Sequence, residues 1–312
     1  MSMLDRLREI AEVREDEPMS RHTTFGIGGP ADCFVRASDE ASLRRAATIA
    51  YAEGTPVFIL GAGSNILVGD GGVRGIVLEH RSRGAEPPQF DVGEPLSDGD
   101  EHTFTVSAGT PFARLARSAS RQGLGGLEWA AGIPGTLGGA VVYNAGAYGG
   151  CLADVLVNIH VLQADDAPRS IAAEELGLAY RSSEFTRGLM RDRVILAVTL
   201  RLHRRDAAAA VARIEELESR RKRSAPRGRN AGSVFKNPSE HPAWWLIDQV
   251  GLRGHRIGDA QISEKHSNYV VNVGEAGAAD VAALMTLAQR RVADNFGITL
   301  EPEVSRVGEG FE

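Results

Sequence analysis

The sequence has 312 residues, is 43% hydrophobic and carries a formal net charge of −6. This length is sufficient for two or three domains with a large core. The acidic balance argues against a nucleic-acid-binding protein, because such a protein needs a basic surface to neutralise phosphates. The one basic run, at 220–223, stands at the predicted end of a helix, where cations complement the helix dipole.

Cysteine usage and hydropathy indicate a protein of a reducing compartment. Cys33 and Cys151 lie far apart and form no CxxC or Cys/His cluster, which predicts neither a metal site nor a disulfide framework. Residues 1–16 are charged and lack the apolar core of a signal peptide, and no apolar run of about 18 residues occurs. We therefore expect a soluble, cytoplasmic protein without a membrane segment. We also expect a monomer, although no sequence feature shows the oligomeric state.

The N-terminal part of the chain is predicted to alternate helices and strands. Apolar residues recur at helical spacing from Leu4 to Val13, until Pro18 ends the pattern. A turn-rich segment at 21–30 follows. The next expected elements are a strand at 31–37, a helix capped by Ser38 or Asp39 and closed by Gly54, and strands at 56–60 and 75–79.

A glycine-containing turn, GAGSN at 61–65, directly follows the strand at 56–60. It lacks the third glycine of the dinucleotide fingerprint and the Lys-Ser/Thr pair of a P-loop, and strand-like sequence continues at 66–68. Its backbone N–H groups, the Ser64 hydroxyl and the Asn65 amide could still hold a pyrophosphate without a helix dipole.

The stretch from Gly125 to Gly150 contains nine glycines. Glycine at this density is tolerated where the backbone takes positive φ or approaches another group closely. Within 132–139, Pro134 stiffens the loop, Thr136 adds a hydroxyl donor, and backbone N–H groups free of regular pairing could point at an anion. A tight-turn linker or a barrel corner is the alternative, although the interleaved apolar residues indicate burial.

The remaining elements are predicted from periodicity and turn residues. They are a surface loop and domain crossing at 81–101, strands at 102–108, 155–163, 194–202 and 268–272, and helices at 111–122, 206–223 and 278–295. Pro302 favours an edge or exit position near the C-terminus. Three polar sites stand out, namely Arg181, Ser233 and the pair Glu301 and Glu303, but sequence spacing alone does not bring them together.

Six motifs occur in one order along the chain. They are GAGSNILV at 61–68, GIPGTLGGAVVYNAGAYGG at 132–150, YRSSEF at 180–185, NAGSVFKNP at 230–238, SEKHSNYVVN at 263–272 and LEPEV at 300–304. This ordered set, which covers nearly the whole chain from Arg21 to Gly308, closely resembles the UDP-N-acetylenolpyruvoylglucosamine reductase family.

The resemblance implies an α+β fold, with a two-subdomain FAD-binding region of the vanillyl-alcohol-oxidase/PCMH type and a smaller C-terminal α/β substrate domain. The expected domains are FAD-binding subdomain 1 at 1–80, to which a C-terminal strand at 299–312 returns, FAD-binding subdomain 2 at 81–205, and the substrate domain at 206–298. FAD would be bound noncovalently, with NADPH as the hydride-donating cosubstrate. The residues expected to bind FAD are Gly61, Ala62, Gly63, Ser64, Asn65, Ile133, Pro134, Gly135, Thr136, Gly138 and Gly139.

The resemblance also implies the reaction and its catalytic residues. The reaction would reduce UDP-N-acetylglucosamine enolpyruvate to UDP-N-acetylmuramate, a step in peptidoglycan precursor synthesis, with hydride passing from NADPH to FAD and then to substrate. Arg181 and Glu303 match residues that bind the enolpyruvyl carboxylate region and support the enolic intermediate. Ser233 matches the proton donor.

These residue types suit that chemistry. Hydride addition to the terminal carbon leaves negative charge delocalised into the carboxylate, which a guanidinium can meet through a bidentate fork. Glu303 would have to be protonated or to orient the substrate, so we expect burial to raise its pKa. Serine is a weak acid, but a carbanion of this kind is more basic, so proton delivery from Ser233 is reasonable.

One departure separates this chain from the longer family type. The link from Leu202 to Ser233 has no room for the extra lid segment whose tyrosine folds over substrate, so the chain resembles the shorter type. Tyr148 and Arg229 are candidates for covering the substrate. The full set of expected substrate contacts is Asn237, Tyr148, Arg229, Lys236 and His266.

Two other functions are compatible with parts of the pattern. An FAD-linked oxidase of the same superfamily would need a larger substrate domain, and often has a histidine bonded covalently to flavin; neither is visible here. A non-catalytic flavin or nucleotide-sugar-binding protein is disfavoured by the presence of Arg181, Ser233 and Glu303 together.

Overall fold

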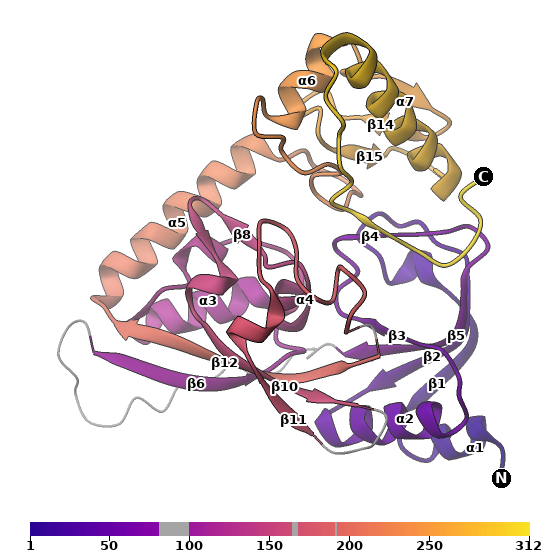
Figure 1. Cartoon of the computed structure of the whole chain (residues 1–312), viewed down its shortest axis with the longest axis vertical. Helices are drawn as coiled ribbons and strands as arrows, with labels where there is room; N and C mark the ends of the chain where they lie inside the picture. The colour runs from indigo at the N-terminus through magenta and orange to yellow at the C-terminus, as the bar shows by residue number, and fades with distance from the viewer. Residues whose placement is uncertain (81–99, 164–167, 191) are drawn as a thin grey trace. The chain divides into compact units, whose positions relative to one another are not determined.

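The computed structural model describes residues 1–80, 100–163, 168–190 and 192–312 (Figure 1). The chain divides into two compact units. Unit one contains residues 1–13, 35–61 and 78–221, and unit two contains residues 14–34, 62–77 and 222–312. Most of the loop predicted at 81–101 lies outside the described residues.

A four-stranded sheet is built from the N-terminal part of the chain. Its strand order is β1 (Glu12–Pro18), β2 (Pro30–Ala37), β5 (Val73–His80) and β3 (Val57–Leu60). Helix α2 (Glu40–Ala52) begins at Asp39, whose side chain accepts the N–H of Ser42, as the predicted cap requires. The side chains of Leu43, Ala46 and Ala47 on this helix are fully buried, which gives the sheet an apolar cover.

The predicted N-terminal helix is wrong beyond its first turns. Helix α1 ends at Arg8, and strand β1 begins at Glu12, so Val13 lies on a strand. The apolar spacing extends over only three turns, which is too short to hold a helix without packing, and pairing with β2 supplies the backbone hydrogen bonds instead.

The second sheet forms the core of unit one. Its order is β11 (Arg169–Ala172), β10 (Leu156–Leu162), β12 (Val194–Arg204) and β6 (Glu101–Ser107), with β7 (Leu124–Gly125) also paired to β12. All of these pairs are antiparallel, and Val198 on β12 lies opposite both Ile159 and Val106. Helices α3 (Phe112–Arg121) and α4 (Leu137–Val142) cover one face of this sheet (Figure 1). Helix α5 (Ala207–Ser224) follows β12.

Unit two packs two helices against a small sheet. The sheet has the order β13 (Arg256–Ile257), β14 (Ala260–Ile262) and β15 (Val270–Asn272), and the helices are α6 (Ala243–Gln249) and α7 (Ala278–Phe296). The Asp70 carboxylate accepts the N–H groups of Ala278 at 2.9 Å and Ala279 at 3.3 Å. A residue distant in sequence therefore caps α7 and complements its dipole.

The C-terminal segment of the chain returns to an early strand. Strand β16 (Ser305–Val307) pairs in parallel with β4 (Ile66–Val68), and Ser305 lies opposite Ile66. The short elements that remain are the 3-10 helices η1 (Met19–Arg21), η2 (Glu128–Ala130), η3 (Leu152–Asp154) and η4 (Ala173–Leu176), and strands β8 (Gly146–Ala147) and β9 (Gly150–Cys151).

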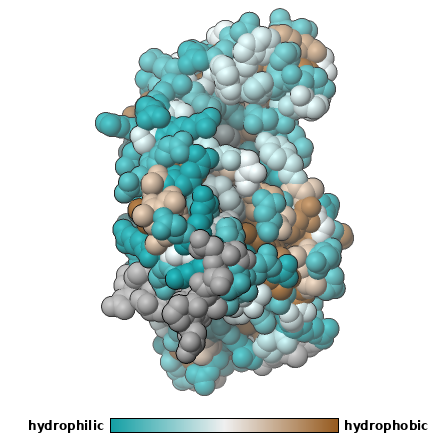
Figure 2. Space-filling view, turned by 90° about the vertical axis from the view of Figure 1, so that its left-hand side faces the viewer, coloured by the Kyte–Doolittle hydropathy of each residue, from teal (hydrophilic) through white to brown (hydrophobic). Residues whose placement is uncertain are grey.

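Most other predicted elements are confirmed to within a few residues. The strand expected at 268–272 begins two residues later, at Val270. The exception is the loop expected at 132–139, whose last residues are helical. The predicted domain boundaries stay a prediction. None of the helices in the described part of the chain has the length and apolar composition needed to cross a lipid bilayer. The face drawn in Figure 2 is mostly hydrophilic, with smaller hydrophobic patches.

The buried His80 at the end of β5 links stability to pH. It is 8% exposed, its Nε2 lies 3.5 Å from the Ser107 hydroxyl oxygen, and burial lowers its pKa to about 4. An unfolded histidine titrates near pH 6.5, so protons bind the unfolded chain more tightly than the folded one. The folded state therefore loses stability as the pH falls from about 6.5 to 4.

We expect His80→Gln to remove up to about 3 kcal/mol of this pH-dependent loss. Urea unfolding at pH 7 and pH 4.5 measures this effect: the unfolding free energy of the variant should differ less between the two pH values than that of the wild type. The exposed His255 provides a matched control, since His255→Gln should keep the wild-type difference. Equal pH dependence in wild type and His80→Gln would contradict the assignment.

Candidate active site

The predicted anion-binding loop at 132–139 is more regular than the sequence suggested. Thr136 is the N-cap of α4, and its hydroxyl oxygen accepts the N–H of Gly139 at 3.3 Å. The N–H groups of Leu137 and Gly138 donate to the carbonyls of Thr110 and Ala108 at 2.9 and 2.8 Å. The expectation that these N–H groups are free for an anion is therefore wrong.

The two glycine-containing segments predicted to bind flavin meet in unit one at Gly61. A Cβ at Gly61 would lie 2.5 Å from the Thr136 hydroxyl oxygen, which is closer than real Cβ contacts allow. Glycine is therefore required for the turn after β3 to approach the N-terminus of α4.

Gly63 is required for a close contact between two parts of the protein's own backbone. Its φ is +61°, and a Cβ there would collide with the His22 carbonyl oxygen. The Gly63 carbonyl accepts the N–H of Thr24 at 3.0 Å. The segment at 21–30, for which no functional role is predicted, thus supports the predicted flavin turn within unit two.

Gly139 differs from Gly61 and Gly63. A Cβ at Gly139 would meet only the Thr136 hydroxyl oxygen, at 3.5 Å, which is an ordinary van der Waals contact. Among the described residues, no other side chain comes within 4 Å of that Cβ position. A planar or phosphate-bearing cofactor fits such a cradle, because it approaches the backbone where a side chain would otherwise stand.

Arg181 lies at a tight turn in unit one. Ala179 and Ser182 exchange two backbone hydrogen bonds, of 3.0 and 3.1 Å, so Tyr180 and Arg181 form the tip. The φ of Arg181 is +51°, a left-handed conformation that is uncommon for a residue with a side chain. Its Nη2 donates to the Gly146 carbonyl at 2.8 Å, which connects the YRSSEF motif to the glycine-rich stretch.

The segments of Ser233 and Glu303 lie side by side in unit two. The N–H of Glu303 donates to the Val234 carbonyl at 2.8 Å, and Phe235 is bridged to Pro302. Residues 70 positions apart in sequence are thereby brought together. Arg181 belongs to the other unit, so the structure groups two of the three predicted catalytic residues.

Asn65 connects the predicted flavin turn to the same place. Its Nδ2 donates to the Glu303 carbonyl at 3.2 Å, and its own carbonyl accepts the N–H of Ser305 at 3.1 Å. The pairing of β16 with β4 continues these bonds.

Asn268 is a structural residue that sequence reasoning missed. It is 2% exposed, its Oδ1 accepts the N–H of Phe235 at 3.0 Å, and its Nδ2 donates to the Phe235 carbonyl at 2.8 Å. Its backbone carbonyl accepts the N–H of Val234. An asparagine at the start of a predicted strand, directly before Tyr269, Val270 and Val271, is the signal that could have identified it.

The expected substrate contacts have individual partners. Asn237 accepts the N–H of Ala243 through Oδ1 at 3.0 Å, at the start of α6. The Tyr148 hydroxyl donates to the Leu217 carbonyl at 3.3 Å, and the Arg220 guanidinium lies over the Tyr148 ring.

The other three expected contacts lie in unit two. Lys236 pairs with Glu301 at 2.6 Å, and Arg229 donates to the Gly274 carbonyl. His266 lies against the Tyr269 ring, and burial lowers its pKa. Their roles toward the substrate stay predictions.

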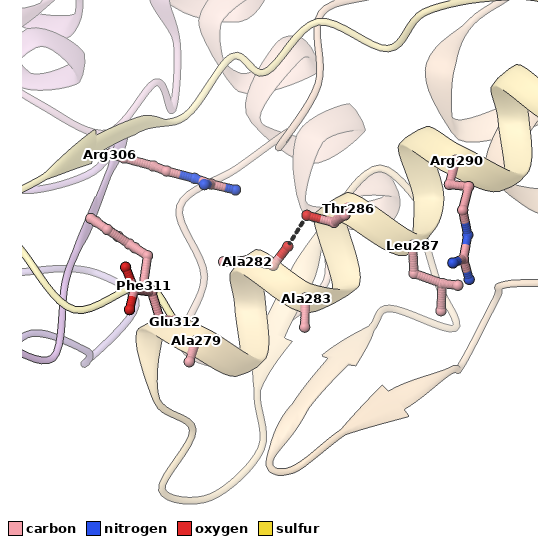
Figure 3. Close-up of a pocket in the computed structure, with 9 residues that line it drawn as sticks. All are labelled: Ala279, Ala282, Ala283, Thr286, Leu287, Arg290, Arg306, Phe311 and Glu312. Atoms are coloured by element: carbon pink, nitrogen blue, oxygen red, sulfur yellow. Dashed lines mark hydrogen bonds between the residues drawn. The ribbon is translucent and has the colours of Figure 1, made fainter.

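An open groove follows α7 in unit two (Figure 3). Small side chains of α7 form its floor, and Arg290 and Arg306 lie at its sides. None of its lining residues belongs to the predicted site. The described residues contain no cluster of three or more His, Cys, Asp or Glu side chains that could hold a metal ion.

Comparison with known proteins first defines the class. Residues 31–167, which include the Gly61 turn and the whole glycine-rich stretch, match the model of the FAD binding domain. The chain is therefore a flavoprotein with an FAD-binding domain in its N-terminal half.

The second match defines the family. Residues 223–307, which include Ser233 and Glu303, match the C-terminal domain of UDP-N-acetylenolpyruvoylglucosamine reductase. A reductase of this name from Symbiobacterium thermophilum is 43% identical over 307 residues, covering 97% of this chain and 96% of the relative. One from Agathobacter rectalis is 42% identical over 301 residues, covering 95% and 94%. The chain belongs to the UDP-N-acetylenolpyruvoylglucosamine reductase family.

A solved structure agrees with this assignment. The UDP-N-acetylenolpyruvylglucosamine reductase of Thermus caldophilus is 36% identical, with a TM-score of 0.77 and coverage of 95% of this chain and 99% of that one. The predicted family, the α+β fold class with an FAD-binding region and a C-terminal domain, and an FAD-dependent oxidoreductase are thus confirmed.

Substitutions at Gly139 and Gly63 separate cofactor effects from folding effects. We expect Gly139→Val to be purified folded, with a thermal midpoint near that of the wild-type apoprotein, but with little bound FAD. Gly63→Val should lose both stability and FAD, because its Cβ collides with backbone. Absorbance at flavin wavelengths and thermal unfolding measure the two effects. A Gly139→Val protein that stays fully loaded with FAD would contradict the placement of the cofactor.

Proposed function

We propose that this chain reduces UDP-N-acetylglucosamine enolpyruvate to UDP-N-acetylmuramate with electrons from NADPH. The observation that carries the proposal is the hydrogen bond between Glu303 and Val234, which brings the segment of Ser233, the predicted proton donor, beside that of Glu303. Full-length similarity to reductases named for this substrate supports it.

FAD is the group that would accept hydride from NADPH and supply it to the substrate. Residues 61–65 and 133–139 would hold it noncovalently. Within unit one, Gly61 lets the backbone approach Thr136, and the room for a Cβ at Gly139 supports this placement of the cofactor. Asn65 would orient one end of the cradle, since both its amide and its carbonyl are fixed by the C-terminal segment.

Arg181 would bind the substrate carboxylate. Hydride addition at the terminal carbon of the enol ether places negative charge on the adjacent carbon and in its carboxylate group. A guanidinium stabilises this charge best when it is fixed before the reaction, because it then needs no reorganisation. Its left-handed backbone and its bond to Gly146 indicate such fixation.

Ser233 would deliver the proton to the adjacent carbon. The new C–H bond forms as the Ser233 O–H bond breaks, and the resulting alkoxide is reprotonated by solvent. Glu303 would orient the substrate from the neighbouring segment. Because Val234, Phe235 and Asn268 are buried and hydrogen-bonded together, the Ser233 main chain is held in one position.

The finer assignments belong to the same proposal. We infer that Asn237, Tyr148, Arg229, Lys236 and His266 contact the substrate. The FAD-binding subdomains would span 1–80 and 81–205, with 299–312 returning to the first, and the substrate domain 206–298. The enzyme would act as a cytoplasmic monomer.

Ser233→Ala separates the two halves of this reaction. NADPH should bleach the flavin at close to the wild-type rate, because that step needs no proton from Ser233. Reoxidation by UDP-N-acetylglucosamine enolpyruvate should slow by roughly 10²-fold or more, the loss expected for a positioned general acid. Anaerobic stopped-flow absorbance measures both rates.

The exposed Ser239 in the same segment provides a control, and Ser239→Ala should leave both rates unchanged. Ser233→Cys should recover part of the lost rate, because a thiol also donates a proton. Normal reoxidation of the Ser233→Ala protein by substrate would show that the proton comes from another group.

A further inference from the structure

Left-handed backbone is concentrated in two segments of unit one. Four non-glycine residues in the described part of the chain have positive φ, and three of them are Asn144, Tyr148 and Arg181. Such conformations cost free energy and persist only where surrounding contacts enforce them. Two of these three residues have predicted functional roles, whereas Asn144 has none.

Asn144 ends helix α4. Its N–H donates to the Val141 carbonyl at 3.1 Å, and the N–H of Ala145 donates to the Ala140 carbonyl at 2.8 Å. These two bonds form the Schellman motif, in which the residue after the C-cap is left-handed. The φ of Asn144 is +40°, and asparagine is the residue other than glycine that best tolerates this conformation.

The Asn144 side chain joins two loops. It is 6% exposed, its Nδ2 donates to the Ala179 carbonyl at 2.9 Å, and its Oδ1 accepts the N–H of Ala153 at 3.0 Å. If the amide were rotated by 180°, its oxygen would face the Ala179 carbonyl and its NH₂ group would face the Ala153 N–H. These two contacts therefore fix the orientation of the Asn144 amide. Buried bonds of this kind are costly to leave unmade.

Both ends of Arg181 depend on the segment that Asn144 begins. Ala179 closes the turn that carries Arg181, and its carbonyl accepts from both Ser182 and Asn144. The Arg181 guanidinium donates to Gly146, two residues after Asn144. Hydrogen bonds therefore hold both the backbone turn and the guanidinium of Arg181 against one short stretch, residues 144–146.

We propose that Asn144 is a positioning residue that holds Arg181 in place for the substrate carboxylate. This inference rests on the proposed function, in which Arg181 meets that carboxylate. Without the Asn144 amide, the turn at 179–182 loses its tie, and Arg181 can relax from its left-handed backbone. A displacement of about 1 Å in such a group can reduce a rate about 10²-fold.

Asn144→Gly is the most selective variant. Glycine favours the left-handed position after a helix, so the backbone is kept while both side-chain bonds are removed. In the FAD-loaded protein we expect flavin reduction by NADPH within about twofold of wild type, and reoxidation by substrate about tenfold slower or more. The Kd for UDP-N-acetylmuramate, measured by calorimetry on the oxidised protein, should rise about tenfold.

Asn144→Asp provides a second variant. Its carboxylate can still accept from Ala153, but it places an anionic oxygen against the Ala179 carbonyl. Its reoxidation rate and product affinity should fall at least as far as those of Asn144→Gly. Asp16, which is exposed and has φ +49°, provides the matched control, and Asp16→Gly should leave both rates and the Kd unchanged.

A double-mutant cycle decides whether Asn144 acts through Arg181. If it does, Asn144→Gly should slow reoxidation little further in an Arg181→Ala background. The inference would be overturned if the double variant slowed reoxidation by the product of the two single-variant factors. So would equal losses in both half-reactions together with a lowered thermal midpoint, since these indicate a purely structural role.

The failure of the inference is distinguishable from that of the proposed function. If Arg181→Ala slows reoxidation while Asn144→Gly matches wild type in rate and Kd, positioning by Asn144 is wrong and the role of Arg181 stands. If wild-type protein is not reoxidised by UDP-N-acetylglucosamine enolpyruvate, the proposed function itself is wrong, and with it the inference.

Discussion

The close approach of one segment to another at a few glycines is the constraint on which the predicted site depends. Gly61 lets the turn after β3 come within side-chain distance of Thr136, and Gly63 lets it rest on the His22 carbonyl. A Cβ at either position would push the segments apart. Gly139 differs, because a Cβ there would make only an ordinary contact with the Thr136 hydroxyl oxygen.

Hydrogen bonds from asparagine side chains fix the segments that these glycines bring together. Asn65 ties the flavin turn to Glu303, Asn268 clamps the main chain beside Ser233, and Asn144 ties the Arg181 turn to the end of α4. Each amide offers a donor and an acceptor, so one side chain can satisfy two backbone groups in a loop that has no ladder partner. The loops that contain the predicted catalytic residues are thus held by side-chain hydrogen bonds, as strands are held by the backbone hydrogen bonds of a sheet.

Most strands and helices can be predicted from the sequence, because periodicity, caps and turn residues determine secondary structure locally. The predicted helix is wrong for 9–13, where pairing with β2 outweighs a short helical pattern. Thr136 is the N-cap of α4, a role that threonine often has but that the predicted loop does not include. Asn268 and Asn144 were missed because their partners lie 33 and 35 positions away. Ser233 and Glu303 are adjacent only through pairing that spacing does not reveal, and the catalytic roles came from resemblance.

The central claim is that the chain couples NADPH oxidation to reduction of an enolpyruvyl ether. The most direct measurement is anaerobic incubation of the FAD-loaded protein with NADPH and UDP-N-acetylglucosamine enolpyruvate, followed by mass spectrometry of the sugar nucleotide. The account predicts one UDP-N-acetylmuramate, two hydrogens heavier than the substrate, for each NADPH consumed. The account would be contradicted if NADPH reduced the flavin but the substrate was recovered unchanged.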